Sequence, residues 1–208
     1  MKLTIKISAF LFFIFFSPKF LGAQNSWDVK TLEKANTAKN INYLTSEEKK
    51  VIQYCNLVRL NPKLFLETFA KSYLDSTKEN NSYTKSLIKT LKSAKSSDAL
   101  SPSENLYLLA KGHAIDFGKK GKTGHGNFDK RFMKMIQECN CTVGENCDYG
   151  NNKALDIVMS LLIDNDVPDL GHRINILDPQ YRNIGVSIQA HKKYEWNCVM
   201  DFSGVSLK

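Results

Sequence analysis

The sequence lacks an apolar run long enough to cross a bilayer. Its most hydrophobic stretch, residues 7 to 16, is interrupted only by Ser8 and spans about half of the roughly 20 residues that a membrane helix needs. Two lysines precede this stretch, and a small-residue cleavage site ends at Ala23. The pattern is typical of a secretory signal, so we expect residues 1–23 to be removed and the mature chain, from Gln24 onward, to be exported.

The sequence also lacks internal repeats and any basic stripe with interleaved aromatic residues. The missing stripe excludes nucleic acid as an expected partner. The formal net charge falls from +8 to +5 when the three lysines of the signal leave, because residues 1–23 contain no acid. Many remaining lysines lie in a Lys, Ser and Asn-rich region over residues 71–95. We interpret its lysine-bearing helix face as solvated, with an anionic partner such as membrane or cell-wall polymer as the alternative.

The cysteines are few and odd in number. All five lie in the exported part, which indicates an oxidising compartment, and the odd count leaves at least one thiol unpaired. Cys55 falls on an apolar helical stripe and is expected to be a buried free thiol. The other four, Cys139, Cys141, Cys147 and Cys198, are expected to form two disulfides. Pairing the first two would close a strained ring, so two connectivities stay open; zinc ligation by the first three is an alternative with less suitable spacing.

Hydrophobic periodicity predicts helices through most of the chain. Thr45 and Glu48 form a capping box that starts a helix ending near Arg59, and Pro62 starts the next helix. A second capping box begins at Ser101. The helices expected after it, from their 3.6-residue repeat, cover residues 102–119, 128–136 and 154–165.

Past Pro179 the apolar residues recur with a period of two. This alternation predicts two half-buried strands over residues 184–190 and 194–202, joined by a hairpin at 191–193. The fold class is therefore α+β. We expect residues 24–44 to form a flexible arm and residues 45–208 to form a single domain, with a Lys/Ser-rich insertion at about 71–100.

Potential acid, base and ligand groups gather around the apolar helix at 154–165. Glu145 precedes it in an expected turn, Asp164 ends its narrow polar stripe, and His172 follows it. His125 lies in a glycine-flanked turn and is expected to join them. His113 lies on the apolar face of its own helix, and we interpret it as a core histidine rather than a ligand.

Several ordered motifs resemble those of the CAP superfamily, which comprises cysteine-rich secretory proteins, insect antigen 5, plant pathogenesis-related proteins and many bacterial members. The resemblance covers roughly residues 45–204. The spacing of His125 from Glu145, the arginine after His172 and the absence of a cysteine-rich tail are similar to the bacterial branch. The matching segments are Asn56, Arg59, Asn61 and Pro62, then Gly144-Glu145-Asn146, Gly171-His172-Arg173-Ile174-Asn175-Ile176-Leu177 and Ile184-Gly185-Val186.

The resemblance implies a three-layer α-β-α sandwich with a central antiparallel sheet and a cleft that holds two histidines and two acids. Carried over by motif, these are His125, Glu145, Asp164 and His172. The second acid position departs from the family pattern, because Leu161 stands where an aromatic residue is usual and Asp164 is shorter than the usual acid. Its contact with the cavity is therefore expected to need a bridging water.

Two neutral imidazoles in one cleft make a candidate site for a divalent ion. We expect His125 and His172 to bind such an ion weakly, zinc first, with Glu145 and Asp164 bound directly or through water. An open coordination position would permit hydrolysis with Glu145 as general base. The alternatives are a serine nucleophile, Ser160 or Ser187 beside His172, and a purely structural hydrogen-bonded cluster.

Two functions remain open. The resemblance favours a secreted, non-enzymatic protein whose cleft binds an extracellular lipid, sterol, glycan or protein with a metal ion. The alternative is a metal-dependent hydrolase of peptide or cell-wall material that uses the same cleft. The protein is expected to be monomeric and secreted, with the periplasm as the alternative compartment.

Overall fold

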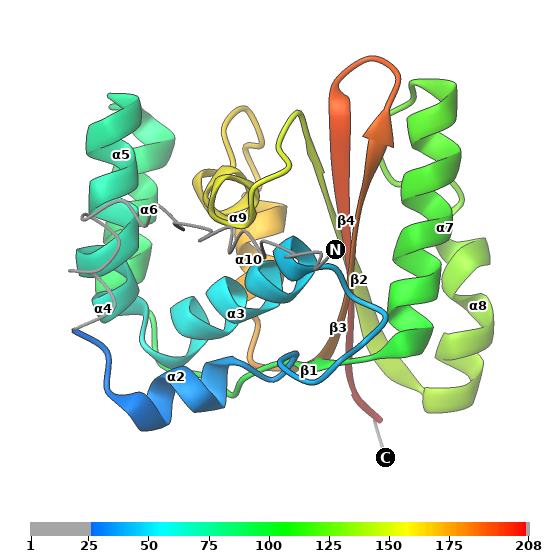
Figure 1. Cartoon of the computed structure of the whole chain (residues 1–208), viewed down its shortest axis with the longest axis horizontal. Coiled ribbons are helices and arrows are strands. Elements are labelled where there is room, and N and C mark those ends of the chain that lie inside the picture. The colour runs from blue at the N-terminus through cyan, green and yellow to red at the C-terminus, as the bar shows by residue number, and fades with distance from the viewer. Residues whose placement is uncertain (1–25, 207–208) are drawn as a thin grey trace, which may run out of the picture.

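The structure is a computed structural model that describes residues 26 to 206, so the expected signal segment lies outside the described residues. It is an α-β-α sandwich around one sheet, as predicted (Figure 1). In the strand order β1-β3-β4-β2, β4 pairs antiparallel with both neighbours, and the two-residue β1 pairs parallel with β3. The strands are β1 (Ser101–Pro102), β2 (Cys141–Tyr149), β3 (Tyr181–His191) and β4 (Glu195–Ser206).

Two layers of helices cover the sheet. One face carries α7 (Glu104–Lys120) and α8 (Phe128–Cys139), and the other carries α3 (Ser46–Leu60), α9 (Ala154–Ile163) and α10 (Gly171–Leu177) (Figure 1). None of the helices between residues 26 and 206 is both long and apolar enough to cross a membrane. The remaining segments extend the second layer: α2 (Val29–Ala35), α4 (Pro62–Phe65), the π-helix η1 (Leu66–Ala70), α5 (Lys71–Thr77) and α6 (Ser82–Ser93).

Helix α3 joins the second layer to the sheet through polar side chains. Its predicted capping box is present, with Thr45 and Glu48 bonded reciprocally. Glu48 also accepts a hydrogen bond from the backbone of Ile188 on β3 at 2.9 Å. The fully buried Arg59 donates to four backbone carbonyls that belong to distant segments, so this residue ties those segments around α10 into one body. Those carbonyls are of Asp98, Ile176, Asp178 and Tyr181.

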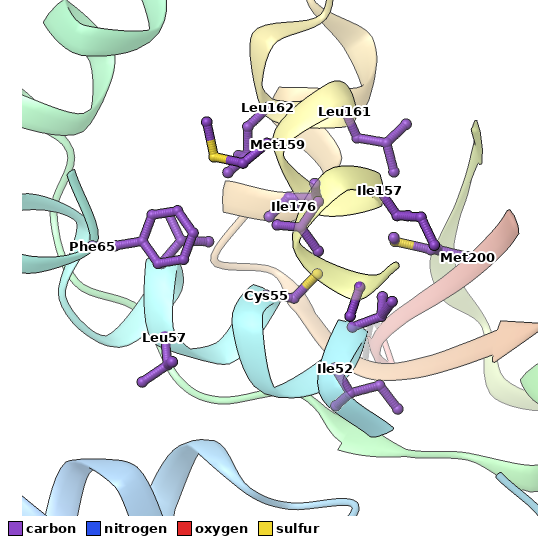
Figure 2. Packing of buried hydrophobic residues seen from close by; sticks show 14 of the residues in the cluster. Ile52, Cys55, Leu57, Phe65, Ile157, Met159, Leu161, Leu162, Ile176 and Met200 are labelled. Carbon is purple, nitrogen blue, oxygen red and sulfur yellow. The ribbon is translucent and has the colours of Figure 1, made fainter. Parts of the chain in front are cut away.

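The hydrophobic core lies between the sheet and the layer of α3 and α9. Figure 2 shows Cys55 of α3, Ile157 of α9 and Met200 of β4 meeting there. Cys55 is fully buried and is a free thiol, as predicted. Burial raises the pKa of this thiol to about 12, so it packs as an apolar side chain.

Two local predictions are wrong. Residues 26–44 are no flexible arm, because they form α2, bury Trp27 in the core and are tied to the domain by the Asn56 side chain, which donates to the Ala35 carbonyl. The capping box at Ser101 is also wrong. Ser101 and Pro102 pair with β3 instead, and Ser103 is the residue that caps α7.

The expected disulfides are wrong for two of the four cysteines. Cys147 and Cys198 are both buried free thiols. They lie on adjacent strands, but Cys147 packs against α7 whereas Cys198 belongs to the core on the opposite face of the sheet, so they do not face each other. Cys141 is disulfide-bonded, and the side chain of Cys139 lies outside the described part of the structure.

Candidate functional site

Glu145 lies on β2, at the edge of the sheet, and not in the turn expected from the sequence. Alternate residues of this strand face opposite layers. Cys147 packs against α7, and Glu145 shares its face, whereas Asn146 points to the other side and donates to the backbone carbonyl of His172 at 2.9 Å. Strand β2 therefore separates the two halves of the site. Each half supplies one histidine and one acid.

The first half is the pair of His125 and Glu145. The loop between α7 and α8 places His125 so that its Nδ1 donates to Glu145 Oε1 at 2.9 Å. Arg131 of α8 holds the same carboxylate: its Nη2 donates to Oε1 at 2.9 Å, and its Nη1 lies 2.8 Å from Oε2 as an ion pair without hydrogen-bond geometry. The Glu145 side chain is fully buried, while half of the His125 side chain is exposed.

These partners fix the charge of Glu145. Burial by itself would raise the pKa of this carboxyl, but the hydrogen bonds from His125 and Arg131 and the guanidinium charge outweigh it and lower the pKa to about 2. Glu145 is therefore a carboxylate at any physiological pH. Since it accepts the proton of Nδ1, the neutral His125 ring carries its lone pair on Nε2.

The second half is the pair of Asp164 and His172. Asp164 is the C-cap of α9 in the left-handed conformation, with φ 59°, rather than a residue of the helix. Its Oδ1 accepts from His172 Nδ1 at 2.7 Å, and its Oδ2 accepts from the backbone N–H groups of His172 at 3.0 Å and Arg173 at 3.1 Å. The expectation that this acid needs a bridging water is wrong, because the backbone turn brings the shorter side chain to the histidine directly.

Arg173 stabilises this turn through hydrogen bonds. It is buried, and its guanidinium donates to the carbonyls of Leu162 at 2.6 Å and Ile163 at 2.8 Å, two of the unpaired carbonyls at the end of α9. It also donates to the Ser86 hydroxyl of α6 at 2.9 Å. The arginine that follows His172 in the motif is thus a helix cap that fixes the position of Asp164.

The two halves meet at the edge of β2. The ring centroids of His125 and His172 are 6.3 Å apart. Each ring uses Nδ1 for its own carboxylate, and no described residue forms a hydrogen bond with either Nε2. Metal-bound histidines commonly donate their second ring N–H to a carboxylate in this way, so the donor set fits a metal ion held between the two Nε2 atoms.

A cavity of about 410 Å³ opens beside His172. It is lined by β2, α9 and the segment after α9, and also by Tyr73 and Glu79, which belong to the expected insertion. Among these described lining residues there is no lysine or arginine. Asp148 of β2 is buried in its wall, and burial raises the pKa of this acid to about 6. A second hollow of about 400 Å³, between α5 and α6, is lined by no histidine or cysteine of the described chain.

Sequence reasoning missed several residues around Glu145. His113 was interpreted as a core histidine; it is buried and bonded to the Gly124 carbonyl at 3.0 Å, but its Nε2 is also 3.8 Å from Glu145 Oε1. With Glu145 and Cys147 it forms a group that could hold a metal ion. Asp201 of β4 is the cross-strand neighbour of Glu145, and burial and the Glu145 charge raise its pKa well above the usual range. The spacing of Glu145 and Cys147, two residues apart, was the sequence signal that could have placed both side chains on one face of a strand.

The two serines considered as nucleophiles do not pair with a histidine. Ser160 lines the cavity, and Ser187 is fully buried on β3, where it accepts a hydrogen bond from Gln189. Neither hydroxyl has a hydrogen bond to His125 or His172 within residues 26–206. The geometry therefore gives no support to a serine hydrolase.

The sequence was compared with protein families and with known proteins. The family described as "CAP: Cysteine-rich secretory protein family" matches residues 52–202, which is more than half of the chain. The comparison with curated proteins found no match. Among solved structures, an outer surface protein from Borrelia burgdorferi is similar at 21% identity and a TM-score of 0.43, over 59% of this chain and 89% of that one. The likeness is too low to carry an argument, but the family match decides the matter: the chain belongs to the CAP family of cysteine-rich secretory proteins.

Proposed function

We propose that this CAP domain is a secreted binding protein that holds a divalent metal ion of the zinc class between His125 and His172 and takes a polar ligand in the adjacent cavity. The observation that carries the proposal is the shared arrangement of the two imidazoles. Both Nδ1 atoms are engaged by buried carboxylates, which leaves both Nε2 lone pairs available at the edge of β2. Two histidine nitrogens leave further coordination positions for water or ligand oxygen, consistent with weak binding.

The chain's own residues would orient this ion rather than react with it. Glu145 and Asp164 fix the tautomer and the direction of each ring. Bound metal would supply a positive charge that attracts a ligand oxygen. Arg131 holds the Glu145 carboxylate, and Arg173 holds the turn that carries Asp164.

The state of Glu145 favours binding over hydrolysis. A general base at neutral pH works best with a pKa near the operating pH. The pKa of Glu145 is lowered to about 2, and His125 and Arg131 both bind its oxygens, so it is a poor proton acceptor. The hydrolase alternative would need another base: Asp164 is already bonded to His172 and two backbone amides, which leaves Asp148 in the cavity wall, whose pKa is raised to about 6 by burial.

The cavity lining narrows the class of ligand. Its volume of about 410 Å³ lies within the range of small-molecule pockets. Its polar wall contains Glu79, Asp148, Asn151 and Ser160, and no described lysine or arginine lines it to pair with an anion. These groups suit hydroxyl groups or a cationic group of a glycan-like molecule better than the chain of a lipid or the rings of a sterol.

Equilibrium dialysis of the mature protein against zinc tests the proposal. The double variant His125→Ala/His172→Ala is expected to bind one zinc fewer per chain than the wild type. His191→Gln is the matched control, because His191 is a buried histidine at the end of β3 whose Nε2 donates to the Lys122 carbonyl and which is bonded to neither acid of the cleft. Equal zinc uptake by the wild type and the double variant would reject the proposed cleft ion. A metal-dependent hydrolysis of peptide or glycan that disappears in the double variant would favour the enzyme instead.

A further inference from the structure

A second group of metal-ligating side chains lies behind the cleft, on the face of β2 that is covered by α7. His113, Glu145 and Cys147 are all buried, and each offers one ligand atom within 4.8 Å of the other two. His113 Nε2 and Glu145 Oε1 are 3.8 Å apart. Two ligands of a tetrahedral zinc ion lie about 3.3 to 3.8 Å from each other, given bond lengths of about 2.0 to 2.3 Å. A small contraction of the group would therefore create a metal site.

Unpartnered carboxylate oxygens border this group. Asp201 is fully buried, and neither of its oxygens has a hydrogen-bond partner in the described structure; Glu145 Oε2 has only its ion pair with Arg131. Asp201 and Glu145 are direct neighbours on adjacent strands. Two adjacent buried carboxyl groups beside one guanidinium cannot both carry a charge cheaply, and burial and the Glu145 charge raise the pKa of Asp201 well above its usual range, so Asp201 holds a proton when no ion is bound. The layer thus needs either a proton or a bound cation.

The side chains around Glu145 are suitable for a bound cation. His125 and Arg131 contact Glu145 from outside the group, as the outer partners of a metal-bound carboxylate do. Imidazole, thiolate and carboxylate together form a ligand set that binds zinc in preference to magnesium or calcium. The Cys147 sulfur also lies 3.9 Å from Nδ1 of His125, whose side chain is half exposed.

We infer that His113, Glu145 and the thiolate of Cys147 bind a second divalent ion of the zinc class, separate from the ion proposed between His125 and His172. On binding, a sulfur–metal bond replaces the S–H bond of Cys147, and the proton leaves to solvent. The proton that His113 Nε2 donates to the Gly124 carbonyl moves to Nδ1, so that the Nε2 lone pair can bind the metal in place of that contact. The inference does not depend on the cleft ion, because it uses neither His172 nor the Nε2 atom of His125.

Cobalt titration of the mature protein, without added reductant, separates the two sites. A thiolate bound to Co²⁺ gives a charge-transfer absorption in the near ultraviolet, and a site made of imidazoles and carboxylates does not. We expect the wild type and His172→Ala to show this absorption and Cys147→Ser to lose it. His113→Gln is expected to bind cobalt at this site at least about 10-fold more weakly than the wild type.

Matched thiol controls make the result specific. Cys198→Ser and Cys55→Ala remove buried free thiols that lie on the other face of the sheet, and both variants should keep the absorption. Circular dichroism confirms folding, and Cys147→Ala is the second variant if Cys147→Ser is unstable. Absence of the absorption from wild type at saturating cobalt, or its persistence in the folded Cys147 variants, would overturn the inference. His172→Ala tests the cleft separately, because the His172 side chain is bonded to Asp164 and to none of the three proposed ligands of the second ion. Its loss of one zinc with retention of the cobalt absorption is expected, so either proposal can fail without the other.

Discussion

His125 and His172 approach each other around the edge of β2, with ring centroids 6.3 Å apart, although they reach it from opposite faces of the sheet. Each ring is fixed through Nδ1 by a carboxylate of its own layer. The edge strand therefore acts as the common support of both pairs. Among residues 26–206, β2 pairs only with β4, so no strand covers the edge at which the two rings meet.

Asp164 should govern metal affinity through His172 rather than by direct ligation. In Asp164→Asn, the amide can no longer accept both the ring N–H and two backbone N–H groups as a carboxylate does, so the His172 ring loses its orientation. We expect zinc to bind about 10- to 100-fold more weakly at the cleft. Asp166→Asn, an exposed change two residues away, is the control and should leave affinity unaltered. Isothermal calorimetry on both variants measures the effect, and equal affinities would remove Asp164 from the site.

Gly185 should tolerate no side chain. A Cβ atom at this position would lie 2.1 Å from the backbone nitrogen of Tyr107 and 2.2 Å from the carbonyl carbon of Leu106, so α7 would be forced away from β3. We expect Gly185→Ala to lower the free energy of unfolding by about 3 kcal/mol.

Gly112 of α7 provides a control in which the same change is expected to have the opposite effect on stability. Nothing lies within 4 Å of a Cβ atom at this position, so Gly112→Ala should raise the free energy of unfolding by about 0.5 to 1 kcal/mol through helix propensity. Urea denaturation of the two variants checks both signs. Equal effects of the two changes would contradict the close contact between α7 and β3.

Asp148 should make the protein less stable as the pH rises. Burial raises its folded pKa to about 6 from an ordinary value of 3.8, so the folded state holds a proton that the unfolded chain has already lost between these values. Relative to Asp148→Asn, the wild type should lose up to about 3 kcal/mol of unfolding free energy between about pH 3.5 and pH 7. Denaturation in chelator at several pH values measures this difference, and a constant difference would show that the pKa is not raised.

Arg173 should be essential for the turn that carries Asp164. Replacing it with methionine keeps much of the side-chain volume but leaves the carbonyls of Leu162 and Ile163 buried without donors. We expect a loss of roughly 2 to 4 kcal/mol in the free energy of unfolding. Arg182→Met serves as the control because Arg182 is half-buried and donates to the Tyr181 carbonyl at the start of β3, away from α9. If the two variants unfold at the same denaturant concentration, the capping role of Arg173 is wrong.

The sequence predicted most elements of the fold because their signals are local. The capping box at Thr45, the 3.6-residue repeat of α7 and the alternation in β3 and β4 each depend on a few neighbouring residues. Strand β2 was missed because buried polar residues lie on both of its faces, toward the cleft and toward α7. Glu145 and Asn146 occupy positions where a strand would usually show alternating apolar residues.

The site was predicted as far as motif spacing reaches. His125, Glu145 and His172 were chosen from motifs, and the structure brings them together with Asp164 in two bonded pairs; their roles remain proposals. The reach of Asp164 could not be predicted, because it depends on a left-handed backbone conformation at the end of α9. Arg131 contacts Glu145 from α8, and Asp201 is its neighbour on β4. Because both are distant in sequence from Glu145, no local sequence pattern predicts these contacts.

Anomalous diffraction from crystals soaked in zinc tests the central proposal most directly. The account predicts a peak at the edge of β2, between the Nε2 atoms of His125 and His172, with both Nδ1 atoms still bonded to Glu145 and Asp164. A zinc ion bound to either Nδ1 would contradict the account. So would a crystal that has bound zinc elsewhere but shows no peak between the two rings.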